Sequence, residues 1–190
     1  MTHTQPKVPN AVIGAYVFVA SELVFFAGMV NAYLSFRSQI PVWPPLGQPR
    51  LPVELTAVNT VFLLISGVML YLANKAFADP FLKTKTLRYL GLGIAFGGLF
   101  LLIQGYEWVE LMLFADMRAN HSIYAALFYM IIGTHAFHVV LTLAFLVYVF
   151  TKISQAKKHK DLAGTFFVGR IFWFFVVGVW PFLYIMVYVL

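Results

Sequence analysis

Four ionisable side chains stand inside runs of sequence that are otherwise apolar. His135 and His138 are three positions apart in IIGTHAFHVV, a spacing that places both imidazoles on one face of a helix. Glu22 lies in the first apolar run, and Glu107 lies in the third, one turn after Gln104. Carboxyl and imidazole groups in this combination can form hydrogen-bonded pairs, exchange protons or ligate metal ions. We call these five residues the polar seam.

The depth of each side chain in its run indicates which of them meet. Burying an ionisable side chain in a bilayer costs at least about 2.5 kcal/mol, so each should face a partner or a cavity. At about 1.5 Å per residue, Glu22 lies about 16 Å from the start of its run, whereas His138 and His135 lie about 20 and 24 Å from the end of theirs. We therefore predict that His138 pairs with Glu22 and that His135 joins Glu107 and Gln104. Depth counting resolves about one helical turn, so the exchanged assignment stays open.

The polar seam has three candidate roles: a structural one that fixes helix register, proton exchange, and ligation of a metal or haem. Two histidines with two carboxylates nearby would suit iron or manganese in a helix bundle. The E-x-x-H motifs of di-iron bundles are missing, however, and a bis-histidine haem needs ligands from facing helices. The other histidines, His3, His121 and His159, lie in the terminus or in loops. We therefore favour the structural role and expect neither metal nor haem in this chain.

The composition is that of a membrane protein. Of the 190 residues, 62% are hydrophobic and only 11% are charged, and the mean hydropathy is +0.85. A soluble domain has about 25% charged residues. Cysteine is absent, which excludes disulfides and thiolate metal sites. The formal net charge of +6 is scattered along the chain, so it bears on orientation in a membrane and gives no support to nucleic-acid binding.

Five apolar runs are long enough to cross a bilayer, which needs about 20 residues per helix. Long, continuously apolar runs in an odd number favour helices over the short alternating strands of a membrane β-barrel. We predict an all-α bundle of five transmembrane helices that forms one membrane domain over residues 1–190. The predicted helices cover about 11–36, 54–77, 87–115, 122–151 and 168–190.

Gly93 and Gly97 form a G-x-x-x-G pattern in the third run. Small residues at this spacing let two helix backbones approach closely in a membrane, where lipid supplies no hydrophobic drive between helices. The pattern indicates a helix contact on this face.

Basic residues predict the orientation, because they accumulate on the cytoplasmic side. Assigned alternately to the two sides, they place the N-terminus in the cytoplasm and the C-terminus in the periplasm. Lys157, Lys158 and Lys160 serve as orientation signals, and contact with anionic lipid headgroups or an acidic partner subunit is an equal alternative. The cytoplasmic set is Lys7, Lys75, Lys83, Lys85, Arg88, Lys152, Lys157, Lys158, Lys160 and Arg170, against Arg37, Arg50 and Arg118 on the other side.

Blocks along almost the whole chain resemble subunit III of the haem-copper oxidases, the cytochrome c and quinol oxidases. They lie in the family's order and spacing over about residues 11–190, and the most specific are S-E-x-x-F-F-A-G, Q-x-x-E-W and H-x-x-H. The common form of the family has seven transmembrane helices, and this chain resembles the last five, as short bacterial forms do. The blocks are SELVFFAGMVNAYLSFR, WPPLG, NTVFLLISGVMLYLA, LGLGIAFGGLFLLIQGYEW and GTHAFHVVLT.

The resemblance implies a non-catalytic accessory subunit of a respiratory complex in a bacterial inner membrane. In this family, subunit III packs beside catalytic subunit I and other oxidase subunits, which hold the haem and copper. It binds phospholipid between its helices, supports proton uptake and protects the active site during turnover. The resemblance also implies that the oxidase complex belongs to a larger respiratory supercomplex. By motif, Glu22 matches the family's buried carboxylate, His135 and His138 match its H-x-x-H, and Glu107 matches its Q-x-x-E glutamate.

The last helix departs from the family pattern W-H-F-V-D-x-x-W. Trp173 and Trp180 hold the tryptophan positions, but Phe174 and Val177 replace the histidine and the aspartate. Two alternatives to the oxidase subunit stay open. One is the accessory protein of nitric oxide reductase, which shares this fold, and the other is a small proton-coupled transporter that uses the polar seam. A third class, an independent membrane haem or di-metal enzyme, would require a prosthetic group on this chain.

Overall fold

The computed structural model describes residues 10–190, so Lys7 and His3 lie outside the described part of the chain. The described residues form five long helices and no strand, which confirms the predicted all-α, five-helix fold. All five helices are long and apolar enough to span a membrane. They are α1 (Asn10–Gln39), α2 (Val53–Phe77), α3 (Lys83–Leu113), α4 (Ile123–Gln155) and α5 (Ala163–Tyr184), joined by short 3-10 turns at Pro80–Leu82 and His159–Leu162 and followed by a π-helical turn, η3 (Ile185–Val189).

The helices extend beyond the apolar runs at several ends. α3 begins at Lys83 where the prediction placed residue 87, α4 continues to Gln155 beyond the predicted 151, and α5 begins at Ala163 before the predicted 168. The extra turns of α3 and α4 carry polar and basic residues, whereas residues 163–167 of α5 include only Thr165 as a polar side chain. Hydropathy marks only the part of a helix that lies in hydrocarbon, whereas the backbone hydrogen bonds continue into the interface.

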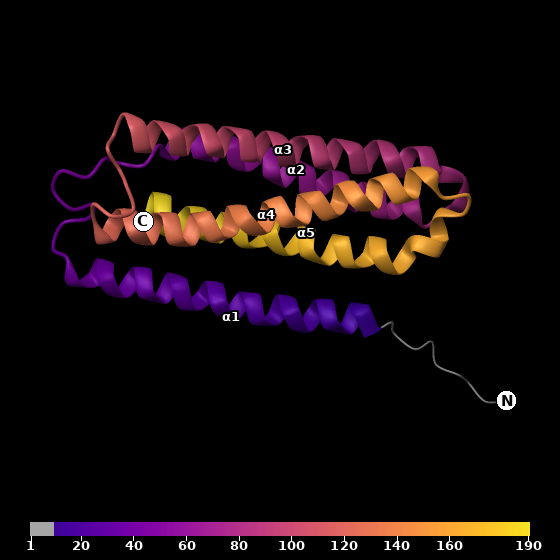
Figure 1. Cartoon of the computed structure of the whole chain (residues 1–190), viewed down its shortest axis with the longest axis horizontal. Coiled ribbons are helices and arrows are strands. Elements are labelled where there is room, and N and C mark those ends of the chain that lie inside the picture. The colour runs from indigo at the N-terminus through magenta and orange to yellow at the C-terminus, as the bar shows by residue number, and fades with distance from the viewer. Residues whose placement is uncertain (1–9) are drawn as a thin grey trace.

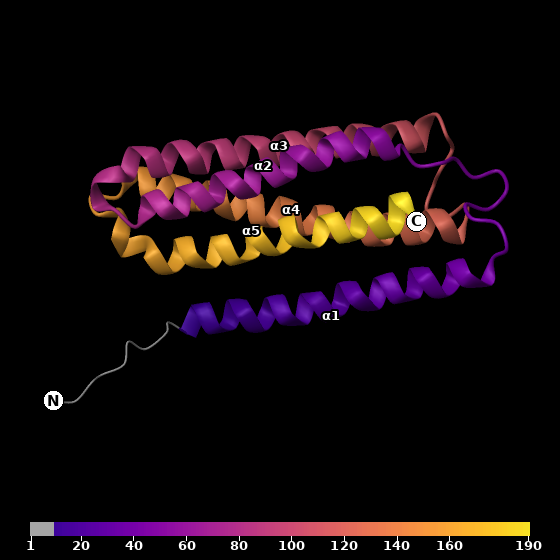
Figure 2. The same ribbon diagram turned by 180° about the vertical axis from the view of Figure 1, so that it is seen from behind.

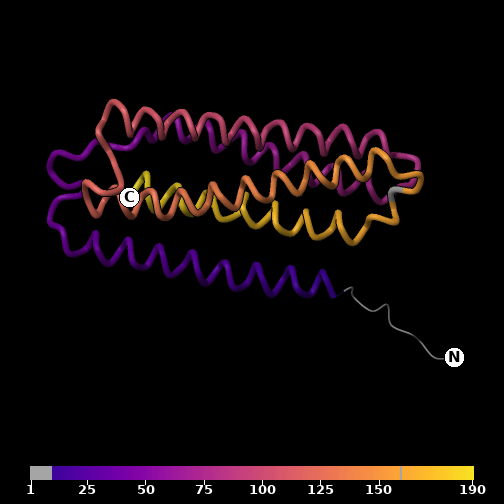
Figure 3. Tube along the Cα trace, viewed as in Figure 1, coloured from indigo at the N-terminus to yellow at the C-terminus, as the bar shows by residue number. Residues whose placement is uncertain are grey.

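The helices run alternately up and down (Figures 1 and 2). The short connections α2–α3 and α4–α5 lie at one end, which we call the turn end, together with the start of α1. The longer connections 40–52 and 114–122 lie at the opposite end, which we call the loop end, together with the last residue of η3. The tube in Figure 3 shows α2 and α3 as one layer, α4 and α5 as a second, and α1 alongside the second layer.

Helix α5 is the centre of the bundle, and α1 is its periphery. Within their apolar spans, 56% of the α5 residues are buried, against 22% of those in α1. Two tryptophans join α5 to α2: Trp173 Nε1 donates to Ser66 Oγ at 3.1 Å, and Trp180 Nε1 donates to Thr60 Oγ1 at 2.9 Å. Each indole thus fills core volume and satisfies its one polar atom inside the chain.

Side chains also fix the ends of the helices. Lys83 Nζ donates to the carbonyl oxygens of Ser154 at 2.9 Å and Ala156 at 2.7 Å, which ties the start of α3 to the end of α4. A cation here satisfies carbonyls that have no partner within their own helix. Ser122 caps α4 at the loop end, where its Oγ accepts from the backbone N–H of Ala125 at 3.0 Å.

Gly93 and Gly97 do lie where elements approach closely, as the G-x-x-x-G pattern predicts. A Cβ added to Gly93 would lie 3.3 Å from the backbone oxygen of Ser66 in α2. At Gly97, an added Cβ would lie 2.5 Å from Cη2 and 2.7 Å from Cζ2 of Trp173, which is fully buried. The Trp173 ring therefore occupies the space that a side chain at position 97 would need.

We expect Gly97→Ala to destabilise the protein by about 1–3 kcal/mol, because the methyl group overpacks a rigid buried indole. Gly98→Ala is the matched control, since an added Cβ there meets no atom within 4 Å. Thermal unfolding of the purified protein in detergent measures the difference. Equal stability of the two variants would contradict the packing argument.

Candidate functional site

Glu22 of α1 and His138 of α4 meet inside the bundle. Glu22 Oε2 lies 3.1 Å from His138 Nε2, and the two side chains are only 16% and 17% exposed. The contact is within ion-pair distance, although it is not aligned as a hydrogen bond. The structure therefore brings together the two residues that depth counting paired.

The hydrogen bonds of His138 decide how many protons the Glu22–His138 pair holds. His138 Nδ1 lies 2.8 Å from the backbone oxygen of Thr134, which can only accept, so Nδ1 carries a hydrogen. In a neutral imidazole, Nε2 is then an acceptor, and it faces another acceptor if Glu22 is ionised. Attraction between Nε2 and Oε2 requires one more proton, either on the imidazole or on the carboxyl group. The Glu22–His138 pair thus has the composition of a shared-proton site.

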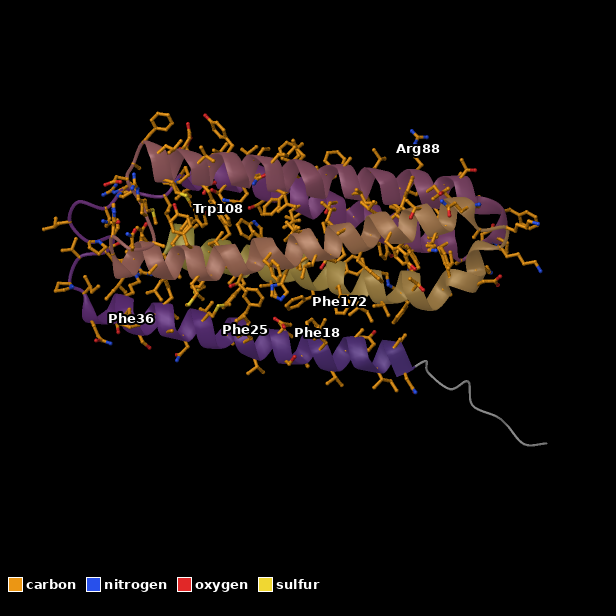
Figure 4. All side chains as sticks on the ribbon, viewed as in Figure 1. Phe18, Phe25, Phe36, Arg88, Trp108 and Phe172 are labelled. Atoms are coloured by element: carbon orange, nitrogen blue, oxygen red, sulfur yellow. The ribbon has the colours of Figure 1, made fainter. Side chains whose placement is uncertain are left out.

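An apolar groove borders this pair. It encloses about 540 Å³ between α1, α4 and α5, and its wall includes Phe18, Phe137 and Phe172 as well as Glu22 and His138. The rings of Phe18 and Phe172 lie 5.6 Å apart at 87°, and Figure 4 shows them on the facing sides of α1 and α5. The Glu22–His138 pair therefore lies at the edge of a space suited to hydrocarbon.

Glu107 forms a second polar cluster with partners from α2, α3 and η3. Its Oε1 accepts from Tyr188 Oη at 2.6 Å, and its Oε2 lies 2.7 Å from Thr56 Oγ1. Gln104 Nε2 donates to Tyr188 Oη at 3.1 Å, and Asn59 Nδ2 donates to the backbone oxygen of Phe100 at 3.1 Å and lies 3.5 Å from Gln104 Oε1. We call Thr56, Asn59, Gln104, Glu107 and Tyr188 the Glu107 cluster.

His135 does not join the Glu107 cluster as expected, since no hydrogen bond links it to Glu107 or Gln104 in the described chain. Its ring stacks on Trp180 with centroids 5.0 Å apart at 28°, and Phe26 packs edge-on at 6.2 Å. Both ring nitrogens are buried without a hydrogen-bond partner. His135 faces α5 where His138 faces α1, because residues three apart point about 60° from one another around a helix. The residues of the polar seam are therefore divided among the Glu22–His138 pair, the Glu107 cluster and the His135 ring that stacks on Trp180.

Among residues 10–158 and 160–190, no three histidine, aspartate or glutamate side chains converge in a way that could hold a metal ion. Glu22 and His138 supply two such groups at one place, and Glu107 supplies one at another.

Sequence reasoning missed the α2 and η3 members of the Glu107 cluster. Thr56, Asn59 and Thr60 are all buried, and their i, i+3, i+4 spacing places them on one face of α2. That spacing was available as a signal for a polar helix face. No comparable signal marks Tyr188, because the π-helical turn of η3 changes the direction in which its side chain points.

The predicted lipid-contact lysines lie at the turn end. Lys157, Lys158 and Lys160 line a pocket of about 270 Å³ with Pro80 and Asp161. None of the three forms an ion pair within the described chain, where salt bridges occur only at Asp116 and Glu22. Their ammonium groups are therefore available to an anion from outside the chain.

The two departures in the last helix have apolar surroundings. Val177 is 8% exposed, and its Cγ1 would lie 3.0 Å from a Cβ added to Gly67 of α2. Phe174 lines a second apolar groove, of about 430 Å³, with Leu23 and Phe182.

The fold and these sites define a class: a multi-pass helical membrane protein whose buried ionisable groups are met mainly by its own side chains. The family model described as "Cytochrome c oxidase subunit III" matches residues 2–190. This chain therefore belongs to the cytochrome c oxidase subunit III family, as the sequence blocks predicted.

Three relatives named "Cytochrome c oxidase subunit 3" illustrate the similarity. The protein of Synechocystis sp. is 31% identical over 179 residues, which cover 93% of this chain and 74% of the relative. That of Dasypus novemcinctus is 34% identical, covering 92% and 67%, and that of Hippopotamus amphibius is 33% identical, covering 98% and 72%. These relatives give no support to the nitric oxide reductase or transporter alternatives.

The shared-proton site leads to a prediction for Glu22. We expect Glu22→Gln to keep the protein assembled, because the amide can donate a hydrogen bond to the acceptor Nε2 of His138. Glu22→Ala leaves a buried imidazole nitrogen without a partner, and we expect it to cost about 1–3 kcal/mol. Thermal unfolding and the yield of assembled protein measure both. Equal loss from the two substitutions would argue against the pair.

Proposed function

We propose that this chain is the accessory subunit III of a haem-copper terminal oxidase in a bacterial inner membrane. In this role it packs beside catalytic subunit I, stabilises it and supports its proton uptake during aerobic respiration. The observation that carries the proposal is the family match, which extends over residues 2–190. The haem and copper belong to the partner subunits, and this chain carries neither. The complex can belong in turn to a larger respiratory supercomplex.

The distribution of side chains supports an accessory role. The ionisable groups within the membrane spans are largely engaged with other parts of this chain, as at Glu22–His138 and in the Glu107 cluster. The outward faces of α1 and α3 are apolar and suit lipid or a neighbouring helix. They include Val17, Val24 and Phe25 of α1, and Leu92, Leu102 and Val109 of α3.

Copurification tests this proposal. A tag on this chain, with extraction in a mild detergent, should recover a companion that contains two haems and copper, identified by optical spectra and metal analysis. Cells with the untagged chain are the control. A companion with non-haem iron, or stoichiometric haem on the isolated chain, would overturn the proposal.

Phospholipid is the other proposed partner, with anionic headgroups bound by Lys157, Lys158 and Lys160. The pocket that these lysines line lies at the turn end of the bundle. A basic residue near an anionic membrane surface contributes about 1 kcal/mol to binding it. The amount of anionic lipid that is extracted with the protein should decrease when all three lysines are changed to Gln. An unchanged ratio of anionic lipid to protein would argue against this contact.

We further propose that the turn end faces the cytoplasm and the loop end faces the periplasm. Lys83, Lys85 and Arg88 lie at the turn end, and Figure 4 shows Arg88 pointing away from the bundle there. Arg37, Arg50 and Arg118 lie toward the loop end. The excess of basic residues at the turn end follows the positive-inside rule.

Thiol labelling tests the orientation, because the natural chain has no cysteine. In spheroplasts, a membrane-impermeant maleimide should label the thiol introduced by Arg118→Cys. The thiol introduced by Lys157→Cys should react only after the membrane is permeabilised. The reverse pattern would contradict the proposed orientation.

A further inference from the structure

The single hydroxyl hydrogen of Thr56 is shared between two acceptors, the Glu107 carboxyl group and the backbone oxygen of Pro52. Thr56 Oγ1 lies 2.7 Å from Glu107 Oε2 and 2.9 Å from the backbone oxygen of Pro52, but its hydroxyl has a single hydrogen. If Thr56 donates to Pro52, then Glu107 Oε2 faces a hydroxyl oxygen and must supply the hydrogen itself. A proton on Oε2 satisfies all three oxygens, while Tyr188 donates to Oε1.

No cation offsets a charge at this position. Glu107 is 1% exposed, and no lysine, arginine or histidine of the described chain lies within ion-pair distance of it. The other titratable groups that act on it are Tyr188 from η3, Tyr129 from α4 and Glu110 from its own helix, and none of these is a cation. Burying an unpaired carboxylate is costly, whereas a neutral acid with two hydrogen bonds is not.

A pocket at the loop end reaches the Glu107 cluster. It encloses about 290 Å³, and its wall includes Tyr33, Trp43, Arg50 and Tyr188. One water takes about 30 Å³ in the liquid, so the space accommodates several. Tyr188 is at once part of this wall and the donor to Glu107, so a single residue separates the pocket from the buried carboxyl group.

We propose that Glu107 is a proton-binding site, a buried neutral carboxylic acid that exchanges its proton with water in the loop-end pocket through the hydroxyl of Tyr188. In uptake, a hydronium ion in the pocket protonates Tyr188 Oη as the hydroxyl hydrogen of Tyr188 passes to Glu107 Oε1. The products are water, neutral Tyr188 and neutral Glu107 with its hydrogen on Oε1. Rotation of the carboxyl group then places this hydrogen toward Thr56, and the Tyr188 hydroxyl turns back to donate to the other carboxyl oxygen. Release is the reverse, and Gln104 holds Tyr188 Oη in place through its amide.

This site is separate from the Glu22–His138 pair. Glu22 and His138 line the apolar groove between α1, α4 and α5, whereas Tyr188 lines the pocket at the loop end. No hydrogen bond of the described residues connects the two. On this proposal the chain holds protons at two places, one beside an apolar groove and one beside a pocket with room for water.

Infrared difference spectroscopy of the purified full-length chain tests the protonation state. At neutral pH, the wild-type minus Glu107→Gln spectrum should contain the carbonyl band of a protonated carboxylic acid. Glu110→Gln is the matched control, because Glu110 is exposed, lies one turn further on the same helix and undergoes the same chemical change. Its difference spectrum should lack this band. Loss of carboxylate bands alone in Glu107→Gln would overturn the proposal.

Thr56→Val provides an independent reading if Glu107→Gln fails to fold. Valine has nearly the shape of threonine but cannot accept a hydrogen bond from the acid, so the acid band should shift. An unchanged acid region in this variant would also overturn the protonated state of Glu107.

Transfer into heavy water tests the route. The acid band should shift as deuterium replaces hydrogen, and Tyr188→Phe should slow that shift severalfold while the band itself persists. Tyr184→Phe is the control, because the Tyr184 hydroxyl donates to the Val53 backbone oxygen and has no bond to Glu107. Exchange in Tyr188→Phe as fast as in wild type, or a wild-type band that never exchanges, would overturn the route.

Discussion

The exclusion of water from the bilayer core is the constraint on which this structure depends. A polar group in hydrocarbon must find its partner within the protein, because the solvent offers none. This explains why the polar face of α2 is turned inward, where Thr56 and Thr60 meet Glu107 and Trp180. The same requirement places α5 at the centre, since its two indoles donate to Ser66 and Thr60 on that face.

The two glutamates show how one residue type acquires different chemistry from its neighbours. Glu22 meets an imidazole, a base that can take the proton from the carboxyl group, so either group can carry the proton. Glu107 meets only hydroxyl and amide groups, none of which is a base at neutral pH. A proton on Glu107 therefore stays on Glu107 unless water takes it. Membrane depth alone does not distinguish these two situations; the identity of the facing helix does.

The sequence predicted the part of this arrangement that depends on distance along a helix. Hydropathy located the five helices, and depth placed Glu22 opposite His138. The direction in which a side chain points is a second coordinate, and it depends on which helices are neighbours. His135 was assigned to Glu107 by depth, but Trp180 of α5 occupies the space beside its ring. Tyr188 could not be assigned at all, because the π-helical turn that aims it is not marked by residue type.

The apolar residues at positions 174 and 177 follow from the same constraint. Val177 packs against Gly67, where an added Cβ would already lie 3.0 Å from the valine side chain, so this contact is close and apolar. On α2, the hydroxyl groups of Ser66, Thr60 and Thr56 already bond to Trp173, Trp180 and Glu107. The polar contacts of α5 with α2 include those of its two tryptophans and of Arg170, which donates to Asn74, and Tyr188 in the following turn donates to Glu107.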